Sequence, residues 1–133
     1  MTAQSHTPAS QVQFEKIGQI ALSVTDLPRA MEFYRNTLGM RFLFEVGNLA
    51  FFQCGDVRLM ISAGDGAKPG GGIIIYFKVE DIHVVYETLR SRGVRFVDKP
   101  HLIAKMPDHD LWMVFLRDPD ENLLGVMCEL SPA

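Results

Sequence analysis

Several features that would define a specialised class of protein are missing from this 133-residue sequence. It has only two cysteines, Cys54 and Cys128, which are too few for a disulfide scaffold and lack the spacing of a zinc finger. No apolar run approaches the ~20 residues that span a bilayer, and the run at residues 73–77 has the length of a buried strand. We therefore expect a cytoplasmic protein with reduced thiols that does not enter a membrane.

An excess of positive charge is also missing. Thirteen Lys and Arg residues stand against sixteen Asp and Glu residues, which gives a net charge of −3. This balance does not suit a phosphate backbone, so nucleic acid is not an expected partner. Residues 1–13 have neither the basic start nor the apolar centre of a secretory signal, and we expect a disordered tail there. The remaining composition, 47% apolar and 22% charged, is that of an ordinary globular domain.

One sequence pattern occurs twice in the chain. Residues 24–27 (VTDL) return as 79–82 (VEDI), and residues 39–42 (GMRF) return as 93–96 (GVRF). In each copy, alternating apolar residues predict a strand, an Asp predicts the N-cap of a helix, and a Gly predicts the end of that helix. The first helix is expected over residues 27–38.

Three further strand-like segments follow each predicted helix. In the first copy they cover residues 40–46, 49–54 and 57–62; in the second they cover 94–97 (with 103 as an alternative end), 111–117 and 122–129. The unit is β-α-β-β-β, with modules at 14–62 and 73–130, a glycine-rich linker at 63–72, and one structural domain overall. In each module one sheet face packs against the helix and the other face is left for a different use.

These motifs resemble the vicinal oxygen chelate superfamily, which includes glyoxalases, bleomycin-resistance proteins, methylmalonyl-CoA epimerases and extradiol dioxygenases. The matching segments are IALSVTDL at 20–27, FY at 33–34, LGM at 38–40 and RDPDENLL at 117–124. The resemblance covers about residues 16–130. It implies an α+β fold in which the mixed sheets of two βαβββ modules form a cup, usually in a homodimer. The superfamily commonly has Gly where Glu121 stands, so we expect Asn122 or a changed turn to accommodate the positive φ.

The resemblance also implies four metal-ligand positions, on the first and last strand of each module. Carried over to this chain, they hold Gln19, Met60, Ile74 and Gly125. Divalent zinc, iron, manganese and nickel need imidazole, carboxylate or water ligands, and only the amide of Gln19 offers an oxygen. We therefore expect no metal and no other cofactor, with a divalent metal as the alternative.

The remaining side chains that could take part in catalysis are concentrated in residues 101–112, which contain two histidines and the only tryptophan. His101 and His109 are the candidate catalytic residues, because imidazole titrates near neutral pH. If residues 105–108 form a four-residue turn, His109 lies opposite Ala104 and His101 lies opposite Trp112. Side chains alternate along a strand, so only one of the two histidines would then face the cup. A polar hairpin without chemistry is the alternative.

Strand alternation and this loop together give a candidate ligand-binding set. Arg58 and Lys78 favour an anionic ligand such as a carboxylate, although a solvated rim is the alternative reading of two long basic side chains. Phe42, Phe44, Phe51 and Phe52 are expected in the core. The candidate ligand-binding residues are Gln19, Ser23, Arg58, Met60, Tyr76, Lys78, Lys105 and Trp112.

The expected function is that of a glyoxalase/bleomycin-resistance-like protein that binds a small organic molecule, with an anion among the expected ligands, in its cup as a homodimer, without a divalent metal. The alternative is a lyase, an isomerase or a ring-cleaving dioxygenase with an atypical site built around His101 or His109. A dimerising module without a ligand is a third reading. The sequence leaves open whether any reaction is catalysed.

Overall fold

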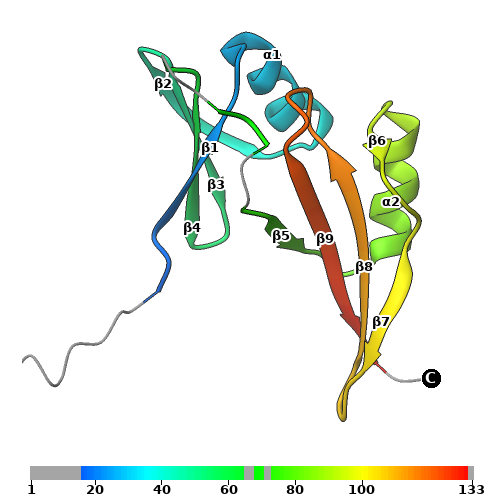
Figure 1. Cartoon of the computed structure of the whole chain (residues 1–133). Coiled ribbons are helices and arrows are strands. Elements are labelled where there is room, and N and C mark those ends of the chain that lie inside the picture. The colour runs from blue at the N-terminus through cyan, green and yellow to red at the C-terminus, as the bar shows by residue number, and fades with distance from the viewer. Residues whose placement is uncertain (1–15, 65–67, 71–72, 132–133) are drawn as a thin grey trace, which may run out of the picture.

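The computed structural model describes residues 16–64, 68–70 and 73–131. Two sheets of mixed strands spread apart as two arms, with a helix against each of them (Figure 1). The tail expected over residues 1–13 and parts of the expected linker lie outside the described residues. Among the described residues, no helix is long and apolar enough to cross a membrane.

The first module forms a four-stranded sheet in the order β1-β4-β3-β2. Its strands are β1 (Gln19–Ser23), β2 (Arg41–Val46), β3 (Leu49–Cys54) and β4 (Val57–Ser62). Strand β1 is parallel to β4, and the other pairs are antiparallel. Asp26 caps the helix as expected, since its carboxylate accepts a hydrogen bond from the backbone N–H of Arg29 at 3.1 Å. The helix begins as α1 (Leu27–Met31) and widens into the π-helix η2 (Glu32–Thr37), a change of pitch that the apolar spacing does not predict.

The second module repeats this plan with an additional strand. Its elements are β5 (Ile75–Lys78), α2 (Ile82–Ser91), β6 (Arg95–Phe96), β7 (His101–Lys105), β8 (Asp110–Arg117) and β9 (Leu123–Leu130). The sheet order is β5-β9-β8-β6, and β7 also pairs with β8. Asp81 caps α2 by accepting hydrogen bonds from the N–H groups of His83 and Val84. The strand expected from residue 94 is divided into β6 and β7, and the break contains Pro100, which has no N–H for a sheet hydrogen bond.

The helix-facing sides of both sheets contribute to one hydrophobic core. The alternating residues that the sequence pattern predicts, such as Leu22 and Val24 in the first copy, are buried in it. The largest side chains that are completely buried come from both modules, and they include Tyr34, Phe52, Ile61, Ile82, Leu116 and Leu124. The core therefore contains side chains of both modules.

A turn of the second module fastens the two modules together. The Tyr34 hydroxyl donates a hydrogen bond of 2.9 Å to Oδ2 of Asp118, and both side chains are completely buried. Nδ2 of Asn122 donates to the backbone carbonyl of Ser23 at 2.9 Å, so the same turn also holds the end of β1. These contacts fix the position of the second sheet relative to the first.

The conformation of Glu121 corrects the expectation for this turn. Glu121 itself adopts a positive φ of 68°, and Asn122 does not take over that role. Its backbone carbonyl accepts a hydrogen bond from Nη1 of Arg117 at 3.1 Å, and its carboxylate lies 2.8 Å from Nη1 of Arg95. The turn therefore keeps its geometry while carrying a side chain that fits the left-handed region poorly.

Candidate functional site

Each sheet has one face turned away from the helices, which we call its open face. In the first sheet, β1 and β4 place Gln19 opposite Arg58 and Ala21 opposite Met60, whereas the alternate residues Leu59 and Ile61 are buried in the core. The β3–β4 register adds Phe51 opposite Met60, and Phe44 stacks on Phe51 with 4.6 Å between ring centroids. The first open face comprises Gln19, Ala21, Ser23, Phe44, Phe51, Gln53, Arg58, Met60 and Ser62.

An arginine is held in place at the end of this face. Nε of Arg58 donates a hydrogen bond of 2.8 Å to Oε1 of Gln19, and the guanidinium carbon lies 5.7 Å from the centroid of the Phe51 ring. Nε2 of Gln19 lies 3.8 Å from the sulfur of Met60. Within the described part of the chain, no carboxylate pairs with Arg58. Its remaining N–H groups are therefore available to an anion lying beside the Phe51 ring.

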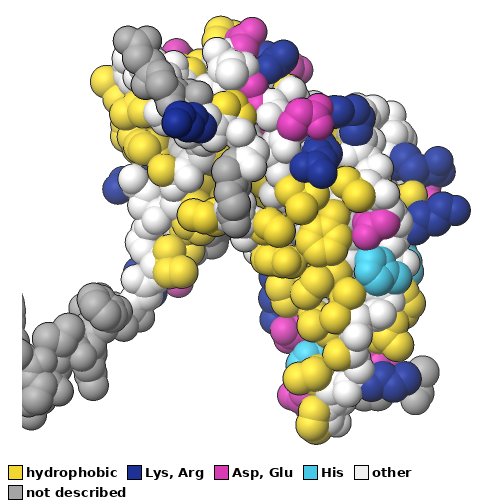
Figure 2. Space-filling view, viewed as in Figure 1, with side chains coloured by type: hydrophobic (Ala, Val, Ile, Leu, Met, Phe, Trp, Pro, Cys, Tyr) yellow, Lys and Arg dark blue, Asp and Glu magenta, His cyan; other side chains and the backbone are white. Residues whose placement is uncertain are grey.

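The second sheet has a more apolar open face. Strand pairing places Tyr76 opposite Gly125, Met113 opposite Met127, and Phe115 opposite Gly125 on one side of this sheet. Hydrophobic side chains gather over β8 and β9 in Figure 2. The second open face comprises His101, Leu111, Met113, Phe115, Tyr76, Lys78, Leu123, Gly125, Met127 and Glu129.

Aromatic rings occupy the space beside Gly125. A Cβ atom at this position would lie 2.7 Å from Cδ2 of Tyr76 and 3.3 Å from Cε1 of Phe115. The two rings meet edge to face, with centroids 5.8 Å apart. A metal-binding side chain at Gly125 would have to displace these rings.

The four expected metal-ligand positions do not fit a divalent metal. The amide oxygen of Gln19 already accepts the hydrogen bond from Arg58. Met60 offers a thioether that suits soft ions, and Ile74 and Gly125 offer no donor. Among the described residues, no three His, Cys, Asp or Glu side chains come together in a way that would hold a metal ion.

A charged cluster lies near the hairpin end of the second open face. Nδ1 of His109 lies 2.8 Å from Oδ1 of Asp108, and this hydrogen bond lowers the pKa of the Asp108 carboxyl. Nε2 of His109 lies 4.0 Å from Glu129, whose other oxygen is 3.2 Å from Nζ of Lys78. Lys78 is therefore paired with a carboxylate, whereas Arg58 has no such partner within the described part of the chain.

The expected register of the 101–112 hairpin is wrong, by one residue at His101 and by two residues at Ala104. A β-bulge at Ile103 places His101 opposite Met113 and Lys105 opposite Asp110. His101 is thus on the open face, and His109, which approaches Glu129, is on the same side. His101 begins β7, whereas His109 lies in the turn beyond the other end of this strand. Nδ1 of His101 is 2.8 Å from the backbone carbonyl of Lys99.

Two other candidates lie on the helix-facing side. Trp112 alternates with the open-face residues of β8 and packs edge to face against His83 of α2, with centroids 5.2 Å apart. Lys105 lies opposite Asp110, and its Nζ is 3.6 Å from the Asp110 carboxylate. Neither Trp112 nor Lys105 joins the open face with Arg58.

Of the four phenylalanines expected in the core, Phe44 is 47% exposed on the open face, and Phe51 is 9% exposed where Phe44 stacks on it. Phe42 packs on Phe52 in the core, but the irregular β2–β3 register after Phe42 brings Phe44 against Phe51 on the other side. The face on which Phe51 lies could be predicted from the alternation of side chains along β3, because Phe51 and Phe52 must point to opposite faces. The bulge that turns Phe44 outward has no comparable signal in the sequence.

A crevice of about 120 Å³ lies where β5 approaches the first module. It is lined in part by Ile20 and Leu59, which belong to the helix-facing side of the first sheet. The first open face therefore points away from this crevice. Cys54 also lines it, and burial raises the pKa of its thiol, which disfavours a nucleophilic role.

Comparison with known proteins identifies the class to which this fold and site belong. Residues 16–126 match the Glyoxalase/Bleomycin resistance protein/Dioxygenase superfamily, and the chain belongs to that family. The chain is also 30% identical over 129 residues to the uncharacterized protein YraH of Bacillus subtilis (strain 168), in a match covering 84% of this chain and 96% of YraH.

Solved structures of the superfamily share the fold. A member from Sphaerobacter thermophilus DSM 20745 is 26% identical, with a TM-score of 0.70, and the match covers 87% of this chain and 98% of that one. Lactoylglutathione lyase from Agrobacterium tumefaciens is 22% identical, with a TM-score of 0.69, over 87% of this chain and 95% of that one. These likenesses agree with the α+β fold expected from the sequence.

Proposed function

We propose that this protein binds a small, planar organic anion on the first open face without the help of a divalent metal. The observation that carries the proposal is the position of Arg58, which Gln19 holds at 2.8 Å beside the Phe51 ring. A guanidinium in this position recognises a carboxylate through paired N–H groups. The stacked rings of Phe44 and Phe51 offer an apolar surface to the planar part of the ligand.

The donor chemistry of the metal positions supports a metal-free mode of binding. One weak oxygen, on Gln19, is engaged by Arg58, and the rings of Tyr76 and Phe115 fill the space beside Gly125. Binding then depends on the cation and the aromatic surface of this chain. It does not depend on an ion that holds the ligand by its oxygen atoms.

We also propose that the site is completed in a homodimer. Each chain leaves two apolar sheet faces uncovered, and Phe44 and Tyr76 are 47% and 44% exposed on them. Within one chain, the first open face points away from the crevice beside β5. A two-fold pairing would set the first open face of one copy against the second open face of the other and enclose the ligand between them.

A titration of the ¹⁵N-labelled protein with 2-naphthoate, read from the amide shifts of residues 51–60, tests the role of Arg58. We expect the R58Q variant to bind about tenfold more weakly or worse, because it loses a charge-assisted hydrogen bond. K16Q removes the same charge from an exposed residue before β1 and should bind like the wild type. Equal affinity in R58Q and the wild type would refute the role of Arg58.

Elemental analysis tests the metal-free part of the proposal. The protein is measured as isolated, and again after loading with zinc, manganese, iron or nickel followed by desalting. We expect well under one ion per chain in every case, and naphthoate affinity that a chelator does not change. Retention of about one ion per chain would show that other residues form a metal site.

A second candidate function, acid–base catalysis, is favoured by one observation. Asp108 orients the His109 ring through a 2.8 Å contact to Nδ1, which leaves Nε2 on the side of Glu129. The His109→Gln variant tests this reading on S-lactoylglutathione, after which the similar Agrobacterium enzyme is named. Turnover by the wild type that is lost in H109Q and kept in H101Q would favour it.

A further inference from the structure

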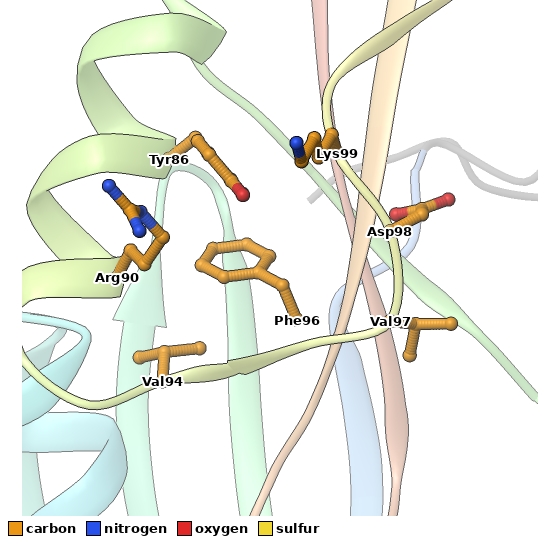
Figure 3. A pocket seen from close by; sticks show the side chains of 7 residues that line it. All are labelled: Tyr86, Arg90, Val94, Phe96, Val97, Asp98 and Lys99. Atoms are coloured by element: carbon orange, nitrogen blue, oxygen red, sulfur yellow. The ribbon is translucent and has the colours of Figure 1, made fainter.

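A groove of about 350 Å³ lies on the other side of the second sheet, away from both open faces. Tyr86 and Arg90 of α2 form one wall, Val94 and Phe96 form the floor, and Asp98 and Lys99 lie on the far side (Figure 3). Phe96 pairs with the buried residue Leu116, whereas its neighbour Arg95 pairs with Arg117 on the opposite sheet face. The groove is therefore separate from the site around Arg58.

The interior of the groove is aromatic and apolar. The rings of Tyr86 and Phe96 lie 4.6 Å apart between centroids and are inclined at 58° to each other. Val94 is buried beneath them. A ligand ring resting on Phe96 would meet the edge or face of an aromatic ring on one side and aliphatic carbon below.

Of the two cationic side chains that line the groove, one is paired with a carboxylate and the other is not. Arg90 is paired with Glu87 at 2.9 Å, and its guanidinium carbon is 5.9 Å from the Tyr86 centroid. Lys99 is exposed, and no ion pair involves it within the described part of the chain. The remaining cation at the groove is therefore Lys99.

The carboxylate of Asp98 also lines the groove, and it is held by the backbone of β8. Its Oδ1 accepts a hydrogen bond from the backbone N–H of Phe115 at 2.8 Å. Figure 3 shows the Asp98 side chain directed away from the Phe96 ring, while the Tyr86 hydroxyl points toward the side where Lys99 lies. One face of the groove thus combines an ammonium group with a hydroxyl that has no hydrogen-bond partner among the described residues.

We propose that this groove is a second binding site, specific for a small aromatic carboxylate. The ring lies on Phe96 beside Tyr86, and the carboxylate lies between Nζ of Lys99 and the Tyr86 hydroxyl. A volume of about 350 Å³ is near the lower end of the range for ligand pockets, which limits the ligand to one or two rings. Because Lys99 is positively charged, the groove should bind this anion more tightly than a neutral aromatic molecule of the same shape.

The test is a titration of the ¹⁵N-labelled full-length protein with 2-naphthoate, followed by amide chemical shifts. We expect saturable shifts at residues 94–99, and about fivefold weaker binding in K99Q because it loses the ammonium group. Neutral 2-naphthamide should bind wild-type protein more weakly by a similar factor. K16Q, which removes a remote positive charge, should bind naphthoate at the groove like the wild type.

Binding at the first open face is read from different amides, at residues 51–60, so the two sites are fitted separately. Shifts confined to residues 51–60 would overturn the groove proposal and leave the Arg58 site standing. The groove proposal also fails if K99Q matches the wild type at residues 94–99, or if the amide binds there as tightly as the acid. Lys99 is exposed, and an otherwise unchanged K99Q spectrum verifies that this variant is folded.

Discussion

Tyr34, in the helix of the first module, donates a hydrogen bond of 2.9 Å to Asp118, in a turn of the second module, and both side chains are completely buried. Asp118 also accepts hydrogen bonds from the backbone N–H and the side-chain amide of Asn122, at 2.8 and 2.9 Å. One carboxylate thus organises its own turn and binds the neighbouring module.

Replacing Asp118 by Asn should destabilise the whole protein. An amide keeps one acceptor oxygen but presents N–H groups to donors that need an acceptor, so we expect a loss of about 3 kcal/mol in the free energy of unfolding. Urea denaturation measures this loss, with Asp56→Asn as the matched control in an exposed turn. Similar stability of the two variants would mean that the Asp118 contacts contribute little.

The stability of the protein should fall in alkaline solution because of Tyr34. Burial, together with the charge of Asp118, raises the pKa of this phenol far above its ordinary value. The phenol ionises near pH 10 in the unfolded chain but stays protonated in the folded one, so the stabilisation is complete below pH 10 and decreases above it. We expect an additional slope of about 1.4 kcal/mol per pH unit above pH 10. Denaturation of wild-type and Y34F protein from pH 9 to 11.5 measures it, and identical slopes would contradict the assignment.

Adding a methyl group at Gly125 should be costly because of Tyr76. The new Cβ atom would lie 2.7 Å from the Tyr76 ring, so G125A should lose about 1–3 kcal/mol of unfolding free energy. In a Tyr76→Ala background the ring is gone, and the same change should cost less. A double-mutant cycle measures the coupling. Equal costs in both backgrounds would mean that Phe115 or the backbone sets the penalty.

Glycine at position 121 should give a more stable protein than alanine at the same position. Glu121 has a φ of 68°, a conformation that strains residues with a Cβ atom, and it also makes an ion pair of 2.8 Å with Arg95. Comparing E121A with E121G removes the ion pair from both variants and isolates the backbone effect. We expect E121G to be more stable than E121A by about 1 kcal/mol. An E121A variant as stable as E121G would show that the turn relaxes.

Much of the fold was predictable because it depends on short-range patterns. Asp26 and Asp81 cap the two helices, and Gly39 and Gly93 end them with φ values of 77° and 85°. Such residues act through their own conformational preferences or through neighbours a few positions away. The division of β6 from β7 follows the same logic, with Pro100 in the break.

The predictions from the sequence were wrong where one extra residue in a strand shifts the register of its pairing. Alternation predicts the side of each residue only as long as pairing is regular, and the bulges at Leu43 and Ile103 break that rule. The sequence therefore misplaced Phe44 and one of the two histidines. The ion pair of Lys78 was not predictable for another reason, because its partner Glu129 lies on a strand far along the chain.

The bulge at Ile103 also bears on how this protein can change by small mutations in its gene. Beyond this point every residue toward the hairpin tip has the opposite orientation from the one that regular pairing would give. Loss of a single in-frame codon here would regularise the pairing and exchange the residues that one end of β7 presents on its two faces. A binding surface altered in that way would differ in several side chains at once, although no amino acid had been substituted.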